Sequence, residues 1–295
     1  METGYAGRAH RGEGDRGRAS GPAVTRARRI GFQVAAAVFA AGAFGGLFGF
    51  GIVLGWSSSD EGGIHRVHQI GFGVLFGVLL TTACLALIRR PERRPSAFLQ
   101  ILAVGVGTLL GSALSANGGV GVLGAIVLVG AAVLFALHPD RGSVLHPGFR
   151  PSPILGAIAV LGSVPLVAFG LATAKLQRTG LAADPHVHEG HWAIMSAMAF
   201  GLVLTGLLAA ARARGWRFSS WCAGVGVAAY GLASIVFHQF PGTDLPYAGS
   251  EGIGWGLAAI GGGLVFVAAS EWQAWADRRA RAAAPERVDQ GMAAA

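Results

Sequence analysis

Long uncharged runs alternate with short charged segments along the whole chain. The longest of them extends from Ser96 to His138 and contains no Asp, Glu, Lys or Arg. About 20 apolar residues span the hydrocarbon core of a bilayer, so this run alone can cross a membrane twice. A water-soluble helix of the same length would need a polar face, which this run lacks. The pattern therefore predicts an all-α, polytopic membrane protein.

Eight membrane-spanning helices are predicted from these runs. Their approximate limits are 30–56, 65–88, 97–115, 119–138, 153–175, 190–211, 218–239 and 252–273. The composition agrees, because only 13% of the residues are charged, against about a quarter in ordinary soluble domains. Cys84 and Cys222 both fall inside apolar runs, so we interpret them as small buried side chains rather than as a disulfide pair.

The basic residues predict how these spans are oriented. With the N-terminus in the cytoplasm, 20 of the 23 Lys and Arg residues lie in cytoplasmic segments. This positive-inside bias favours a multi-pass protein of the plasma membrane with both termini cytoplasmic. Residues 1–29 then form a disordered basic tail, and residues 276–295 form a second cytoplasmic tail. Arginines grouped beside the lipid bilayer favour contact with anionic lipid, and nucleic acid is not an expected partner.

An internal repeat is predicted from a shift of 123 residues, which superimposes spans one to three on spans five to seven. The repeat would divide the chain into two four-helix halves, 30–138 and 153–275, joined by a cytoplasmic linker at 139–152. Both halves would have the same orientation, as in known parallel duplications. The alternative is that any two helices rich in Gly, Ala and Leu look alike. Glycine pairs at four-residue spacing, such as Gly107 and Gly111, predict close contacts between helices.

Histidines gather in two segments at the predicted outer face of the membrane. The first segment contains His65 and His68, and the second contains His186, His188 and His191. Residues i and i+3 share a face of a helix, so each His-x-x-His pair can point in one direction. Imidazole binds transition metals and haem iron, and nearby carboxylates can orient the rings. We therefore expect a metal or haem site made of His65, His68, His188 and His191. His186, His238 and Glu189 are further candidates.

Several alternatives remain for these histidines. Interfacial or purely structural histidines would show the same sequence pattern. A membrane-embedded metal-dependent enzyme or haem redox protein is a second hypothesis, in which Glu189 or Glu61 acts as a base beside a metal-bound water. A small-molecule permease is a third, although the middle of each span lacks the ionisable residues that proton-coupled transporters usually keep. No zinc-protease or attached-haem motif is present, so the leading hypothesis is a non-enzymatic binding site.

Short motifs in the chain resemble a group of uncharacterised multi-pass membrane proteins from high-GC actinobacteria. The motifs are His65-x-x-His68, Asp184-Pro-His186 followed by His191-Trp192, and Glu271-Trp272 after the last apolar run. This resemblance covers spans two to eight and implies no activity. The two four-helix halves with outward histidines are also similar to haem A synthase, which binds haem through the even-numbered helices of both halves. Spans two and six comply with that arrangement, whereas spans four and eight lack the histidines.

Overall fold

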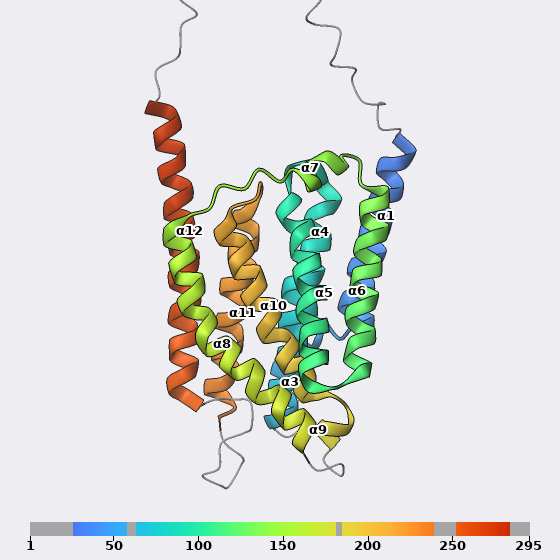
Figure 1. The fold of residues 1–295 in the computed structure, drawn as a ribbon, viewed down its shortest axis with the longest axis vertical. Helices are drawn as coiled ribbons and strands as arrows, with labels where there is room; N and C mark the ends of the chain where they lie inside the picture. Colours follow the sequence, from blue (N-terminus) through green and yellow to red (C-terminus); the bar gives the residue numbers. More distant parts are fainter. Residues whose placement is uncertain (1–25, 58–62, 181–184, 239–251, 284–295) are drawn as a thin grey trace, which may run out of the picture.

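The structure is a computed structural model that describes residues 26–57, 63–180, 185–238 and 252–283. All regular secondary structure in these ranges is helical, and eight helical segments are long and apolar enough to cross a membrane (Figure 1). They are Arg26–Ser57, His65–Arg89, Pro95–Ser115, Gly118–Leu137, Pro153–Thr179, His191–Ala211, Trp216–Val236 and Gly252–Ala283. The prediction of an all-α protein with eight spans is confirmed, and these helices indicate a multi-pass membrane protein. Of the predicted disordered tail 1–29, residues 1–25 lie outside the described residues, and residues 26–29 are instead the first turn of a helix.

The first span is broken, whereas the apolar pattern predicts one helix over residues 30–56. Helix α1 (Arg26–Ala41) continues into the π-helix η1 (Gly42–Gly46), the chain turns at Phe48 with φ +58°, and α2 (Gly51–Ser57) follows. Glycine permits this path, because a Cβ at Gly49 would lie 2.9 Å from the Ala43 carbonyl oxygen and 3.0 Å from the Gly77 nitrogen.

The second span also changes helix type. It consists of α3 (Gly63–Phe72), the π-helix η2 (Gly73–Thr81) and α4 (Thr82–Arg89). The turn η3 (Pro91–Arg93) leads into α5 (Pro95–Ser115) and α6 (Gly118–Leu137). Asn117 caps α6, because its side-chain oxygen accepts a hydrogen bond of 3.0 Å from the Val120 nitrogen. The predicted linker at 139–152 contains one short helix, α7 (Arg141–Leu145).

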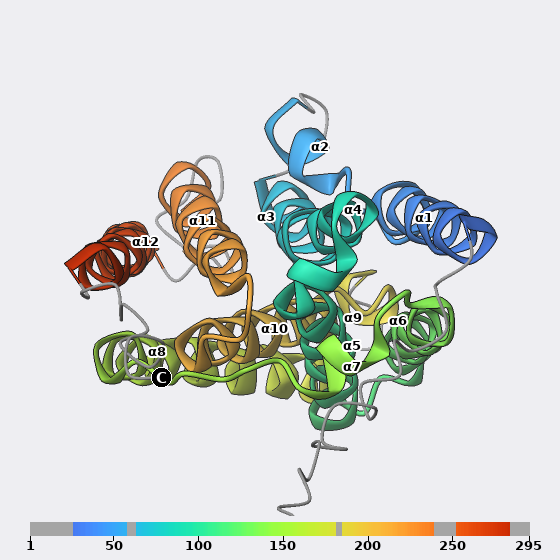
Figure 2. The same ribbon diagram turned by 90° about the horizontal axis from the view of Figure 1, so that it is seen from above.

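The remaining helices are α8 (Pro153–Thr179), α9 (Pro185–His188), α10 (His191–Ala211), α11 (Trp216–Val236) and α12 (Gly252–Ala283). Seen from above, α5 and α10 lie in the middle of the assembly, with α1 and α6 on one side and α8 and α12 on the other (Figure 2). The second and sixth spans are each 78% buried along their apolar stretch, against 17% for the eighth. The interior is therefore built from the two spans that also carry histidines.

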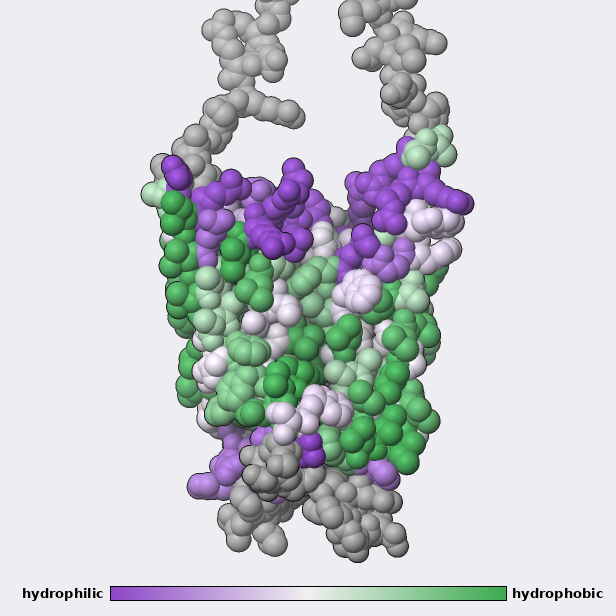
Figure 3. Space-filling model, turned by 180° about the vertical axis from the view of Figure 1, so that it is seen from behind, coloured by the Kyte–Doolittle hydropathy of each residue, from purple (hydrophilic) through white to green (hydrophobic). Residues whose placement is uncertain are grey.

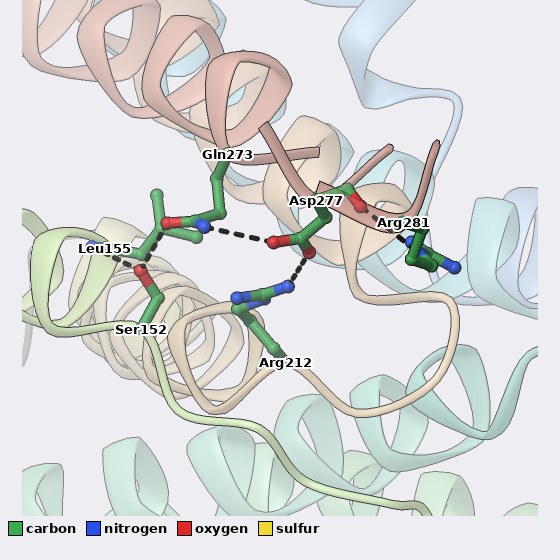
Figure 4. A network of polar contacts seen from close by, with 6 residues as sticks. All are labelled: Ser152, Leu155, Arg212, Gln273, Asp277 and Arg281. Atoms are coloured by element: carbon green, nitrogen blue, oxygen red, sulfur yellow. Dashed lines mark hydrogen bonds and ion pairs between the residues drawn. The ribbon is translucent and has the colours of Figure 1, made fainter. Parts of the chain in front are cut away.

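One end of the bundle is strongly basic, and hydrophilic side chains gather there above a wide apolar belt (Figure 3). We call it the basic end; it holds the start of α1, the end of α12 and α7, and the opposite end is the histidine end (Figure 1). A polar network joins three helices at the basic end (Figure 4). Arg212 forms an ion pair with Asp277, whose other oxygen accepts a 3.2 Å hydrogen bond from Gln273. The Ser152 hydroxyl donates to Gln273 at 3.2 Å and caps α8 by accepting from the Leu155 nitrogen at 3.3 Å.

His138 lies at the basic end just after α6 and is fully buried. Its ring packs edge-on against Phe32 and Phe98, with centroids 5.2 and 6.3 Å away. Its Nδ1 accepts a 3.1 Å hydrogen bond from the Asp140 nitrogen, and its carbonyl accepts one of 2.9 Å from Arg28. Burial lowers the pKa of His138 below the ordinary histidine value, because the charged imidazolium loses its hydration. This histidine is a neutral structural element of the basic end.

Candidate metal centre

Three helices present imidazoles to one another at the histidine end. His65 and His68 lie one turn apart on α3, His186 is on α9, and His191 is the first residue of α10. Gly190 makes the turn between α9 and α10 with φ +73°, a conformation that glycine adopts without strain. A Cβ at Gly190 would also lie 2.9 Å from the Asn117 side-chain nitrogen. The glycine therefore brings the two helices close enough for His186 and His191 to share one space.

The four rings form a compact cluster. The centroid of His186 lies 4.8 Å from His65, 5.2 Å from His68 and 5.7 Å from His191. His191 in turn lies 5.7 Å from His65 and 5.0 Å from His68. The ligand atoms of His65, His186 and His191 are all within 4.8 Å of one another. Nitrogens bound to one tetrahedral ion at about 2.0–2.1 Å are about 3.3 Å apart, so small side-chain rotations would complete the coordination.

His68 is the most buried member of the cluster. Its side chain is 1% exposed, and neither ring nitrogen has a hydrogen-bond partner among the described residues. The same holds for Nε2 of His65. Buried polar atoms in native proteins are nearly always hydrogen-bonded or bound to a metal, because desolvation is otherwise uncompensated. The Trp192 ring packs edge-on against His68, with centroids 4.6 Å apart, and fixes its orientation. The cluster has the properties of a preorganised binding site.

Glu189 contacts the cluster from outside. Its Oε2 lies 3.0 Å from Nε2 of His191. An ionised carboxylate only accepts hydrogen bonds, so in the neutral ring the contact places the proton on Nε2 and leaves Nδ1 as the atom with the lone pair. That Nδ1 atom is buried. A carboxylate that holds the distal N–H of a histidine is the usual support for a histidine ligand. Glu189 therefore orients His191, and this geometry uses its carboxylate for positioning.

The structure brings together His65, His68 and His191 from the predicted set, and His186 joins them. His188 is exposed and makes no ring contact with the cluster among the described residues. The sequence argument assigned His188 and His191 to one helical face, whereas Gly190 separates α9 from α10 and changes the register. His238 lies at the end of α11, with its Nδ1 2.7 Å from the Ile235 carbonyl oxygen. The predicted Glu61 lies outside the described residues.

A single ion suits this packing better than haem does. Bis-histidine haem needs two imidazoles on opposite faces of a flat macrocycle. In this cluster, every pair of contacting imidazoles has a third imidazole whose centroid lies within 5.7 Å of both. The third ring occupies the space that the macrocycle would need. The donor set is all nitrogen, which suits zinc, copper and similar transition metals.

No family model, curated protein or solved structure matches this chain. The conclusions about its class therefore rest on its own residues. Eight apolar helices define a multi-pass membrane protein, and the distinctive chemistry among the described residues is the histidine cluster of α3, α9 and α10.

Proposed function

We propose that this chain is a multi-pass plasma-membrane protein that binds one transition-metal ion at the outer surface of the bilayer. The observation that carries the proposal is the convergence of His65, His186 and His191 within 4.8 Å. His68 adds a buried imidazole directly beneath them. Zinc is the preferred ion, because it accepts imidazole ligands in tetrahedral geometry without a redox requirement. Copper is the alternative ion, and elemental analysis of the loaded protein distinguishes it from zinc.

A metal-dependent enzyme is a second candidate, and the number of close ligands favours it. Catalytic zinc sites have three protein ligands and leave a fourth position for water, whereas structural sites are closed by four. Ligand atoms of three histidines lie within 4.8 Å of one another here, and His68 is not one of the three. The site would then activate a water molecule, with His68 within reach of that water. If His68 is instead a fourth ligand, the site is closed and serves binding or stability.

The packing in the middle of the bundle argues against the permease hypothesis. Leu75 and Leu79 approach Gly201, since a Cβ there would lie 2.9 Å and 3.6 Å from their methyl groups. Leu202 and Val74 approach Gly226 in the same way, at 2.9 and 3.2 Å. These side chains fill the space along the buried second and sixth spans. A route from the histidine cluster to the basic end would need them to move apart.

We propose an orientation in which the basic end faces the cytoplasm, together with both termini. Arginines of α1, α4 and α12, together with Arg212 just after α10, lie at this end, which supports the positive-inside assignment and contact with anionic lipid. We also propose that the eight spans form two four-helix halves. The resemblances to haem A synthase and to the actinobacterial group remain part of this proposal. Its support is that in each half the first span contacts the fourth, and that the halves meet through spans two, three, five, six and seven.

Metal analysis of single-histidine variants tests the metal site. The protein is purified in detergent, stripped with a chelator, loaded separately with zinc and copper salts, and analysed by elemental mass spectrometry after dialysis. We expect about one ion per chain for the wild type. The variant His186→Ala should lose it, and His188→Ala, which removes an exposed histidine of the same short helix, should retain it. Retention by His186→Ala together with loss by His188→Ala would refute the assigned ligand set, and no bound metal in the wild type would refute the site.

Cobalt substitution separates the two candidates once metal binding is established. Tetrahedral cobalt absorbs visible light, and its spectrum changes when an added anion such as azide enters an open coordination position. A spectral change in the wild type supports an open, enzyme-like site. No change in the wild type, followed by a change in His68→Ala, supports a site closed by His68.

A further inference from the structure

A cavity of about 320 Å³ lies between α8, α10, α11 and α12, away from the histidine cluster. Its lining is apolar and includes Leu161, Pro165, Val203, Val227, Trp255 and Phe266. Among the described residues that line the cavity, the only hydroxyl is that of Ser163, which donates a 2.6 Å hydrogen bond to the Ala159 carbonyl oxygen. A water molecule in a protein interior needs two to four polar partners, so this cavity does not suit water.

Glycines keep the cavity open. Gly206 on α10 is buried, yet no atom lies within 4 Å of the position that its Cβ would occupy. Gly162 on α8 and Gly262 on α12 also line the cavity; both are exposed, and no atom lies within 4 Å of their Cβ positions either. In contrast, a Cβ at Gly224 would lie 2.7 Å from the Gly263 carbonyl oxygen, so that glycine allows α11 and α12 to touch. Three helices thus present glycines to open space at one place.

The dimensions of the cavity match a hydrocarbon chain. Its lining on α12 extends from Trp255 to Phe266, which corresponds to about 16 Å along the helix axis. This is about half of the 30 Å hydrocarbon thickness of a bilayer. The adjacent outer faces of α8 and α12 carry exposed apolar side chains, such as Val164 at 66% and Leu264 at 62%. The medium beside the cavity is therefore the acyl region of the membrane.

We propose that this cavity is a binding site for one acyl chain of a membrane phospholipid. The chain lies along α12, against the free Cα faces of Gly162, Gly206 and Gly262, and its outer end contacts the Trp255 ring. That ring also packs against Tyr230 and Phe169, with centroids 5.9 Å away in both cases. The site is independent of the proposed metal centre, because it shares no residue with the histidine cluster.

Photo-crosslinking tests this site. The intact chain is reconstituted in vesicles that contain a phospholipid with a diazirine in the middle of one acyl chain, and labelled peptides are mapped by mass spectrometry. We expect labels on cavity residues of α8, α10 and α11. The variant Gly206→Leu fills the free space and should reduce labelling there at least tenfold. The matched control Gly261→Leu, on α12 but outside the cavity, also meets no atom within 4 Å and should leave labelling unchanged.

Equal labelling of the cavity residues in the wild type and Gly206→Leu would overturn the proposal, as would labels confined to side chains outside the cavity such as Leu264. If Gly206→Leu does not yield folded protein, Gly162→Leu fills the same cavity from α8 and gives the same expectation. Gel filtration and the metal content confirm that each variant is folded. Unchanged metal content with reduced labelling would show that the two sites are separate. Absence of bound metal in the wild type would refute the metal centre and would leave the lipid site unaffected.

Discussion

The contact between α5 and α10 makes a demanding prediction for the substitution Gly111→Ala. An added Cβ at this position would lie 2.5 Å from the Ala197 nitrogen and 2.7 Å from its Cα, both of which are backbone atoms. An ordinary contact begins at 3.4 Å, so the two helices must separate by about 0.9 Å. Backbone atoms cannot rotate away as the end of a side chain can. Overpacking of this kind costs about 1–3 kcal/mol.

Gly206→Ala is the matched control for this substitution. It lies in the same pair of central helices and gains the same helix propensity from alanine, but its Cβ meets nothing within 4 Å. The difference between the two variants therefore isolates the clash. A free-energy difference of about 1–3 kcal/mol corresponds to about 2–5 °C in Tm for a protein of this size, since the unfolding entropy is about 2.1 cal/mol/K per residue.

Thiol reactivity provides the assay for this pair of variants. Cys84 and Cys222 are free and buried, so a maleimide dye that fluoresces after reaction reports the unfolding of the bundle. We expect Gly111→Ala to unfold at a lower temperature than the wild type, and Gly206→Ala to unfold at the same temperature or slightly higher. Equal unfolding temperatures for the two variants would refute the close approach of α5 and α10.

Three further outcomes follow from the polar contacts. Glu189→Gln should weaken metal binding by about 10–100-fold, as measured by chelator competition, because the carboxylate no longer holds the ligand ring; unchanged affinity would contradict the positioning role. The pKa of His138 is lower in the folded protein than in the unfolded chain, so the folded protein loses stability as the pH falls from about 6.5 to that lowered pKa. His138→Gln removes this effect, and its Tm in metal-free protein should fall less between pH 7 and 5 than that of the wild type. Asp277→Ala should lower Tm more than Glu271→Ala does, because its arginine partner is 12% exposed against 48% for the partner of Glu271.

Hydrophobic patterning predicted the spans well, because a bilayer permits few ways to bury a backbone. It could not predict where a helix changes type inside an apolar run, as in the break at Phe48 and the π-helix η2. Hydropathy also missed the end of α12, which continues to Ala283 and takes in the first part of the predicted tail 276–295. Polar residues there extend the helix, since Arg281 donates to the Asp277 carbonyl oxygen one turn earlier.

The histidine site could be predicted only in part. The concentration of histidines at one surface identified the region, and the pairing of the two segments brought His65 and His68 to His191. The exchange of His188 for His186 depends on the turn at Gly190, and a glycine in a sequence does not reveal a φ of +73°. The spacing Gly107-x-x-x-Gly111 predicted a helix contact but not its partner, α10, because the spacing is the same for every neighbour.

The histidines of the cluster lie in two segments that are synthesised at different times. His65 and His68 belong to the second span, His191 begins the sixth, and His186 lies just before it. A chain that is made and inserted from its N-terminus has only half of the cluster until the sixth span enters the membrane. A metal that needs both halves therefore binds after the bundle has assembled, and it then joins early and late segments. Binding of the proposed metal would therefore mark the entry of the sixth span into the bundle.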